Sequence, residues 1–214
     1  MPREDTIRTR KSLLDAASEI FAQKGFRDTT IAEISKRAGA NIAAVNYHFG
    51  SKETLYIEAW RCAFQESLKA YPPDGGVSDN APAEVRFRAH VKATIGRLVD
   101  KKNKDFWLVQ KEFSNPTGLL EEVIRKEFHP LQKKTEGIVR ELLGPHVSEQ
   151  DVQFCETSII SQCVNPMIVG NRSQGKDKAQ TWPRRIKDVN AYAEHISRFS
   201  LAGMKAIRKN AESK

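Results

Sequence analysis

The side chains with the clearest chemical meaning lie in one short segment near the N-terminus. Asn46, Tyr47 and His48 follow one another directly, just after the small residues Ala43 and Ala44. An asparagine amide can form two hydrogen bonds with the edge of an adenine, whereas tyrosine and histidine suit contacts with phosphate. Small residues at the start of a helix let the backbone approach bases closely, and the helix N-terminus favours an anion. The pattern indicates nucleic-acid binding.

The other reactive side chains do not form a catalytic or metal-binding pattern. None of the five histidines has HExxH spacing, and no cysteine lies in a CxxC motif. P-loop, GxSxG and GxGxxG sequences are also absent. Cys155 and Cys163 share one face of a helix, where packing explains them better than redox chemistry does. We therefore expect no enzyme activity, no metal and no cofactor.

Composition limits the class of protein and its partners. The 214 residues include 35 basic and 27 acidic side chains, a formal net charge of +8, and 39% are hydrophobic. This mixture fits a folded soluble protein with a polyanionic partner, either nucleic acid or a membrane surface, and solubility alone is the alternative. No stretch approaches the ~18 apolar residues of a membrane span, and the N-terminus does not resemble a secretory signal. Three cysteines are too few for a disulfide scaffold, so we expect a cytoplasmic protein.

Helical periodicity dominates the sequence, which predicts an all-α fold. The expected helices span residues 6–24, 31–38, 42–48, a segment beginning after Ser51, 83–99, 105–113, 119–143, 148–169 and 188–209. Three prolines and two glycines predict a loop over residues 71–82, and the composition of residues 170–187 predicts a polar connection. Pro130 should kink or split its helix.

The first three helices have the features of a helix-turn-helix. Thr30 and Glu33 predict a capping box at the start of the second helix. Gly39 supplies the small residue that the turn requires, and Asn41 can cap the third helix. The expected core of this region comprises Phe21, Phe26, Ile34, Val45 and Phe49.

Residues 10–56 resemble the DNA-binding domain of TetR-family transcriptional regulators. The matching segments are residues 14–17, 21–26, 29–34, 38–39 and 47–56. The usual Val-Ser after the turn glycine is Ala40-Asn41 here, and Asn46 replaces a frequent tyrosine, a change that would alter base readout. The resemblance implies a helix-turn-helix DNA-binding domain at residues 1–52 and a helical effector-binding and dimerisation domain at residues 53–214.

The resemblance also implies how double-stranded DNA would be contacted. The residues expected to hold phosphates are Thr30, Asn41, Tyr47, His48 and Lys52, and those expected to face the major groove are Ala43, Ala44 and Asn46. The alternatives are that Thr30 and Asn41 act only as helix caps, that His48 packs beside Phe49, and that Lys52 is an ordinary surface charge.

Most of residues 83–169 resemble, more loosely, the C-terminal domain of the CecR-like branch of TetR regulators. The matching segments are residues 109–117, 120–124, 130–131 and 140–144. In the family, the last two long helices pair with those of a second subunit, which implies a homodimer here. The apolar candidates are Val152, Cys155, Ile159, Ile160, Cys163, Ile196, Phe199, Leu201 and Met204. Packing within the chain is the alternative. A dimer would match a palindromic operator with half-sites roughly 34 Å apart.

Interiors of helical bundles bind small molecules among aromatic and polar side chains. The candidates for an effector pocket are Phe106, Trp107, Gln110, Phe113, Phe128, His129, Phe154 and Asn165. For each of them, the alternative is a position in the plain core or on the surface.

These features predict a sequence-specific DNA-binding regulator, with a repressor released by a small-molecule effector as the preferred form. The alternative is an all-helical interaction protein or a nonspecific nucleic-acid binder that acts through the basic residues of 172–187. Residues 1–60 hold nine basic and eight acidic side chains, a net charge of +1. Most of the positive charge therefore lies outside the helix-turn-helix, where the placement of cations matters more than their number.

Overall fold

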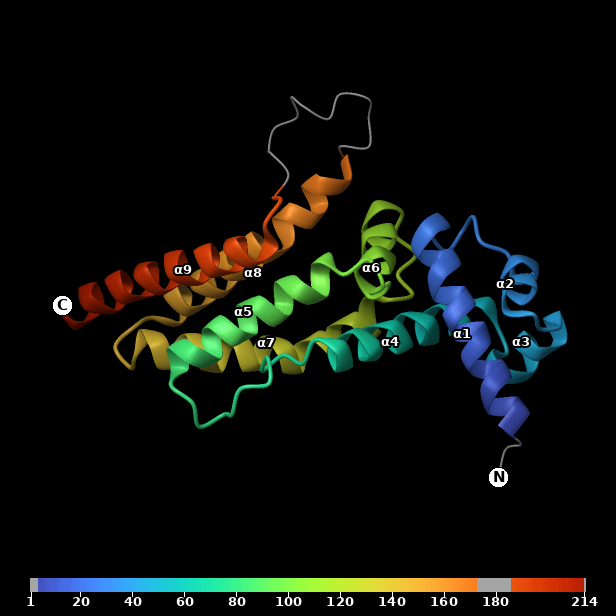
Figure 1. Cartoon of the computed structure of the whole chain (residues 1–214), viewed down its shortest axis with the longest axis horizontal. Helices are drawn as coiled ribbons and strands as arrows, with labels where there is room; N and C mark the ends of the chain where they lie inside the picture. Colours follow the sequence, from blue (N-terminus) through green and yellow to red (C-terminus); the bar gives the residue numbers. More distant parts are fainter. Residues whose placement is uncertain (1–3, 173–185, 214) are drawn as a thin grey trace. The chain divides into compact units, whose positions relative to one another are not determined.

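The structure is a computed structural model that describes residues 4–172 and 186–213, with the side chains of 166–172 left out. The helices are α1 (Glu4–Lys24), α2 (Ile31–Ala38), α3 (Ile42–Phe49), α4 (Lys52–Ala70), α5 (Ala83–Val99), α6 (Asp105–Ser114), α7 (Glu121–Leu143), α8 (Glu149–Arg172) and α9 (Val189–Glu212) (Figure 1). No strand occurs in the described ranges, so the all-α prediction is confirmed.

The predicted helix ends hold to within a few residues, because local capping signals define most of them. Ser51 Oγ accepts a hydrogen bond from the backbone N–H of Thr54 at 3.1 Å at the start of α4. Ser148 Oγ accepts one from the N–H of Asp151, also at 3.1 Å, at the start of α8. The predicted polar connection is shorter at its start, because α8 continues to Arg172. Residues 173–185 of that connection lie outside the described residues.

Of the two effects predicted for Pro130, a split is wrong, because α7 runs through this proline, and a kink stays a prediction. A proline inside a helix removes one backbone N–H donor and leaves one carbonyl without its usual partner. Pro130 lies at an exposed position of α7, where water can hydrogen-bond to that carbonyl. Exposure explains why the helix continues.

The chain divides into two compact units. The first comprises Met1–Ala70 and Lys101–Glu127, and the second comprises Tyr71–Asp100 and Phe128–Lys214. The predicted domain boundary between residues 52 and 53 stays a prediction. In the first unit, α1 packs against α2, α3, α4 and α6. Fully buried side chains in this unit come from several of these helices: Leu13, Phe21, Ile34, Leu55, Tyr56, Trp60, Phe64 and Leu108.

The second unit is built around α5, α8 and α9, which pack against one another in pairs. Figure 1 shows α8 and α9 running side by side. Phe87, Ile159 and Ile196 are buried, one from each of the three helices. The Tyr192 hydroxyl donates a hydrogen bond to the backbone carbonyl of Gln162 at 3.0 Å and so joins α9 to α8. Among the described residues, no helix is both long and apolar enough to cross a membrane.

Candidate nucleic-acid interface

The turn between α2 and α3 depends on a glycine in a left-handed conformation. Gly39 has φ 64° and ψ 30°, and its backbone N–H donates to the carbonyl oxygens at the end of α2. A residue with a Cβ is strained in this conformation, so Gly39 allows the chain to turn sharply into α3. The predicted turn glycine is therefore where the local geometry requires one.

The N-terminus of α2 carries the predicted capping box. Thr30 Oγ1 accepts a hydrogen bond from the N–H of Glu33 at 3.2 Å, and the Glu33 carboxylate accepts one from the N–H of Thr30 at 3.1 Å. Hydrogen bonding to Lys24, the last residue of α1, lowers the pKa of Glu33, and so does the backbone hydrogen bond from Thr30. The carboxylate therefore stays ionised and links the end of α1 to the start of α2.

The short helix α3 has one buried side and one exposed side. Val45 and Phe49 are buried. Ile42, Ala43, Asn46 and Tyr47 form a continuous exposed surface, which we call the α3 stripe. Tyr47 is 78% exposed. Asn41 Oδ1 accepts a hydrogen bond from the N–H of Ala43 at 3.0 Å and so caps the helix. The two buried side chains thus anchor α3, and the α3 stripe remains open to a partner.

Thr30 and Asn41 both act as caps, and both remain exposed. A capping side chain at an open helix N-terminus can still lie next to a phosphate, because neighbouring backbone N–H groups point the same way. The structure therefore brings these two predicted phosphate contacts to helix starts, as an anion-binding role requires.

His48, Lys52 and Ala44 are half-buried. The ring of His48 lies 5.9 Å from that of Phe49 and 5.0 Å from that of Tyr47, so part of its surface packs within the unit. The ammonium of Lys52 lies 4.4 Å from the ring centroid of Phe26, within the range of a cation–π interaction. His48 and Lys52 thus pack against aromatic neighbours and keep part of their polar surface accessible.

Several cations of the first unit form ion pairs with acidic side chains. Ion pairs join Lys24 to Glu33, Arg37 to Glu19, and Arg10 to Glu58. Lys36, near the end of α2, is exposed and forms no ion pair within the described part of the chain. This arrangement agrees with the net charge of +1 over residues 1–60, since internal pairing leaves few cations available to DNA.

The segment between α6 and α7 is fixed to the same unit by a buried carboxylate. Glu112 accepts hydrogen bonds from the backbone N–H groups of Thr117 and Gly118, at 2.8 and 2.9 Å, and from the Tyr56 hydroxyl at 3.1 Å. The Arg27 guanidinium, between α1 and α2, donates to the carbonyl of Pro116 at 3.0 Å. Sequence reasoning missed the Tyr56–Glu112 and Arg27–Pro116 hydrogen bonds, whose partners are 56 and 89 residues apart along the chain.

The eight predicted effector residues divide between the two units. On α6, Phe106 is buried, Trp107 and Gln110 are half-buried, and Phe113 is 72% exposed. In the second unit, Phe128 is half-buried with its ring centroid 5.9 Å from the Arg97 guanidinium carbon. The exposed members of the second unit are His129, Phe154 and Asn165. The structure does not collect the eight residues into one described pocket.

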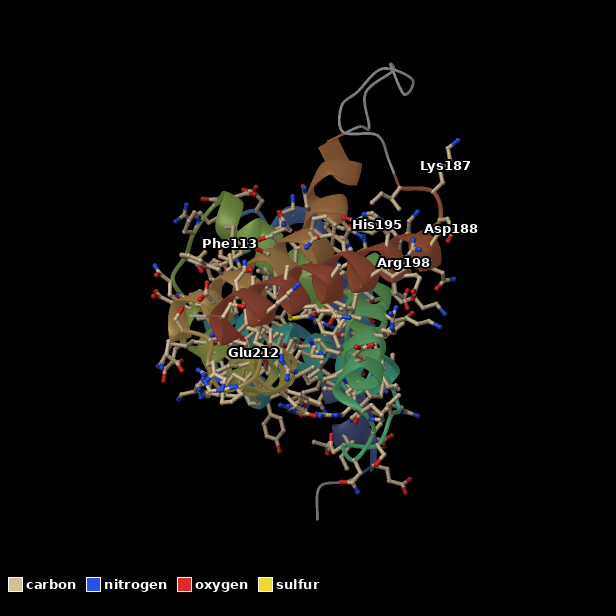
Figure 2. The ribbon with its side chains drawn as sticks, turned by 90° about the vertical axis from the view of Figure 1, so that its left-hand side faces the viewer. Phe113, Lys187, Asp188, His195, Arg198 and Glu212 are labelled. Carbon is tan, nitrogen blue, oxygen red and sulfur yellow. The ribbon has the colours of Figure 1, made fainter. Side chains whose placement is uncertain are left out.

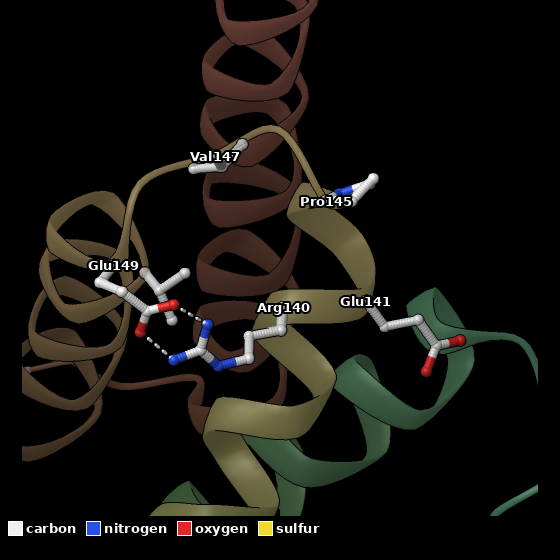
Figure 3. Close-up of a pocket in the computed structure, with 7 residues that line it drawn as sticks. Arg140, Glu141, Pro145, Val147 and Glu149 are labelled. Atoms are coloured by element: carbon white, nitrogen blue, oxygen red, sulfur yellow. Dashed lines mark hydrogen bonds and ion pairs between the residues drawn. The ribbon is translucent and has the colours of Figure 1, made fainter.

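A described pocket lies in the second unit, at the turn from α7 to α8, with a volume of about 450 Å³ (Figure 3). Its lining residues are Arg140, Glu141, Gly144, Pro145, Val147, Glu149 and Val152. Arg140 forms hydrogen-bonded ion pairs with Glu149 and Glu136. None of the eight predicted effector residues lines this pocket, and its central cation already has acidic partners.

Comparison with known proteins identifies the class that this geometry defines. Residues 13–59 match the family of bacterial regulatory proteins of the tetR type, and residues 83–204 match the C-terminal domain of the HTH-type transcriptional dual regulator CecR. The chain therefore belongs to the TetR family of transcriptional regulators, with a CecR-type C-terminal domain, as the sequence predicted. Its helix-turn-helix is the DNA-binding element of that family.

Two known bacterial regulators are similar to about a quarter of the chain. The HTH-type transcriptional regulator AcrR of Shigella flexneri is 36% identical over 58 residues, which is 27% of this chain and 27% of AcrR. The negative transcriptional regulator IcaR of the Staphylococcus aureus biofilm operon icaADBC is 35% identical over 52 residues, 24% of this chain and 28% of IcaR. The chain thus aligns with little more than a quarter of each relative.

Solved structures resemble the whole chain in fold. A TetR-like transcriptional regulator from Rhodococcus sp. RHA1 has a TM-score of 0.69 and 17% identity, covering 96% of this chain and 98% of its own. At this identity the similarity concerns the fold, and it spans both compact units.

Proposed function

We propose that the chain represses transcription as a homodimer that binds a palindromic operator through α3. The observation that carries this proposal is the α3 stripe, which stays exposed while Val45 and Phe49 anchor the helix. In this arrangement α3 enters the major groove, where Asn46 contacts an adenine and Ala43 and Ala44 permit close approach. The phosphate contacts come from Thr30, Asn41, Tyr47, His48 and Lys52.

One of the two relatives supports repression as the mode of action. IcaR, which shares 35% identity over part of the chain, carries the description of a negative regulator. A dimer bound to an operator blocks transcription until a ligand favours a different conformation of the protein. That ligand must bind the two conformations with different affinities, because equal binding does not shift their populations. The proposed place of action is the cytoplasm.

The dimer interface is proposed on α8 and α9. Of the nine apolar candidates, Ile160 on α8 and Phe199 on α9 are exposed and Leu201 is half-buried; the other six are buried within the chain itself. Phe199 is 63% exposed and stacks on His195, at a ring distance of 6.1 Å. Figure 2 shows His195 and Arg198 together on α9.

Small exposed residues follow Phe199 along α9, at Ala202, Gly203 and Ala206. Such residues allow a second helix to approach closely, so α9 presents a face that a second copy can cover. Phe199→Glu should therefore convert the dimer into a monomer in sedimentation experiments. Val85→Glu, at another exposed apolar position of the second unit, is the matched control and should remain dimeric.

The effector is proposed to be a small apolar or amphipathic molecule that binds within the C-terminal domain. Within the predicted set, the neighbouring rings of Phe106 and Trp107 on α6, 5.2 Å apart and both in the first unit, are proposed to contact it. A thermal-shift screen of such molecules tests this assignment, since a ligand that binds the folded state raises Tm with its concentration.

Footprinting on the DNA that flanks the gene tests the central proposal. We expect a protected palindrome that survives competition by random duplex, and we expect Asn46→Ala and Tyr47→Ala to reduce binding strongly. The proposal would be contradicted if random duplex displaced the protein as well as operator duplex does and if neither substitution weakened binding. That result would favour a nonspecific binder, because phosphate contacts alone carry no sequence preference.

A further inference from the structure

Ile42 is the member of the α3 stripe to which the proposed DNA contacts assign no partner. It occupies the first turn of α3 and is 50% exposed. Helical periodicity places it near the buried side of Val45 and Phe49, and it has no role among those predicted from the sequence. Half of a branched apolar side chain is thus left in water at the centre of the DNA-binding element.

The surroundings of Ile42 indicate the chemistry of its partner. The helix α3 contains no acidic residue, and the α3 stripe consists of an isoleucine, an alanine, an asparagine and a tyrosine. The apolar side chain of Ile42, among uncharged neighbours, can pack against an apolar group on a partner whose surface is otherwise polar. The major groove of DNA offers one such feature, the C5 methyl group of thymine.

The spacing along α3 relates this contact to that of Asn46. Ile42 and Asn46 are four residues apart and both exposed, so they are neighbours on one face of the helix. At 1.5 Å per residue their separation along the helix axis is about 6 Å, and successive bases on a strand lie about 3.4 Å apart. The two side chains can therefore reach bases about two positions apart.

We propose that Ile42 determines operator specificity by contacting the C5 methyl group of a thymine, about two base pairs from the adenine that Asn46 contacts. This inference rests on the proposed function, because it requires α3 to lie in the major groove. It assigns to Ile42 a preference for thymine over cytosine and over uracil, neither of which carries a C5 methyl group.

The experiment begins with selection of an operator from a randomised duplex pool by the wild-type protein. Each thymine of the operator half-site is then replaced, one at a time, by deoxyuridine, which removes only the methyl group and preserves base pairing. Dissociation constants are measured by fluorescence anisotropy for wild type, Ile42→Ala and Val85→Ala. Val85 is an exposed branched residue on α5 and is the matched control.

For the wild type and Val85→Ala, we expect one deoxyuridine position to weaken binding about fourfold per half-site, the contribution of one buried methyl-sized group. Ile42→Ala should bind the thymine operator more weakly by a similar factor and should not distinguish thymine from deoxyuridine at that position. Ile42→Val, which keeps a branched apolar side chain, should retain the distinction.

Two results would overturn the inference while leaving the proposed function intact. In the first, the wild type binds a selected operator but tolerates deoxyuridine at every position. In the second, Ile42→Ala loses affinity equally for both operators, or weakens dimerisation in sedimentation experiments, as it would if a second copy covered Ile42. Failure to select any operator would overturn the proposed function, and the inference with it.

Discussion

Removal of the Glu112 carboxylate is expected to destabilise the unit that contains the helix-turn-helix. Glu112→Ala leaves the Tyr56 hydroxyl and the backbone N–H groups of Thr117 and Gly118 without their acceptor. Tyr56 is fully buried, so its hydroxyl cannot turn to water, whereas Gly118 is exposed and its N–H can. At 1–3 kcal/mol for each buried unsatisfied group, the expected loss is about 3 kcal/mol.

For a chain of this length, a loss of about 3 kcal/mol lowers Tm by about 6–12 °C. Differential scanning calorimetry at neutral pH measures this change. Tyr56→Phe removes one hydrogen bond and keeps the ring, so it should cost only about 1 kcal/mol. Glu122→Ala, which removes an exposed glutamate paired with Lys126, is the control and should change stability by less than about 0.5 kcal/mol.

The reasoning about Glu112 would be refuted by a Tm for Glu112→Ala that matches the Tm of Glu122→Ala. Such a result would mean that desolvation of the buried carboxylate offsets its hydrogen bonds. The double variant Tyr56→Phe, Glu112→Ala provides a second check. Its loss should be smaller than the sum of the two single losses, because both substitutions remove the same hydrogen bond.

Three further predictions concern the turn, a buried histidine and a buried thiol. Gly39→Ala should cost about 1–2 kcal/mol in urea unfolding, because alanine is strained at φ 64°, and an unchanged midpoint would contradict this. Burial lowers the pKa of His90, and Lys134 and Arg97 also lower it, so the folded state binds protons less readily than the unfolded state. Stability should therefore fall as pH decreases below about 6.5, more steeply in the wild type than in His90→Gln, and parallel urea curves would argue against it. Burial raises the pKa of the Cys163 thiol to about 12, so N-ethylmaleimide at pH 8 should label Cys163 only after unfolding; labelling as fast as that of the half-buried Cys62 would count against this.

Features that depend on a few neighbouring residues could be predicted from the sequence. The Thr30–Glu33 capping box, the Asn41 cap and the turn at Gly39 are examples, because each partner lies within three residues of the other. Pro130 shows the limit of such rules, since its effect on α7 depends on exposure, which the local sequence does not determine.

Features that depend on long-range packing could not be predicted. The sequence identifies Cys163, Ile196 and Phe199 as apolar, but only the fold decides that the first two are buried within the chain and that Phe199 is exposed. The partners of Glu112 include Tyr56, which is 56 residues away in the chain. Residue type alone likewise did not separate Phe106, which is buried, from Phe113, which is exposed.

The packing of α4 and α6 within the first unit has a consequence for protein engineering. Phe21, in α1, lies 4.8 Å from the ring of Tyr56, and Arg27 is bonded to Pro116. A fragment that ends at residue 52 lacks both partners and loses the packing of α1 against α4 and α6. A chimeric regulator with a transplanted DNA specificity therefore needs two separate segments of this chain, residues 1–70 and 101–127, in place of one N-terminal cassette.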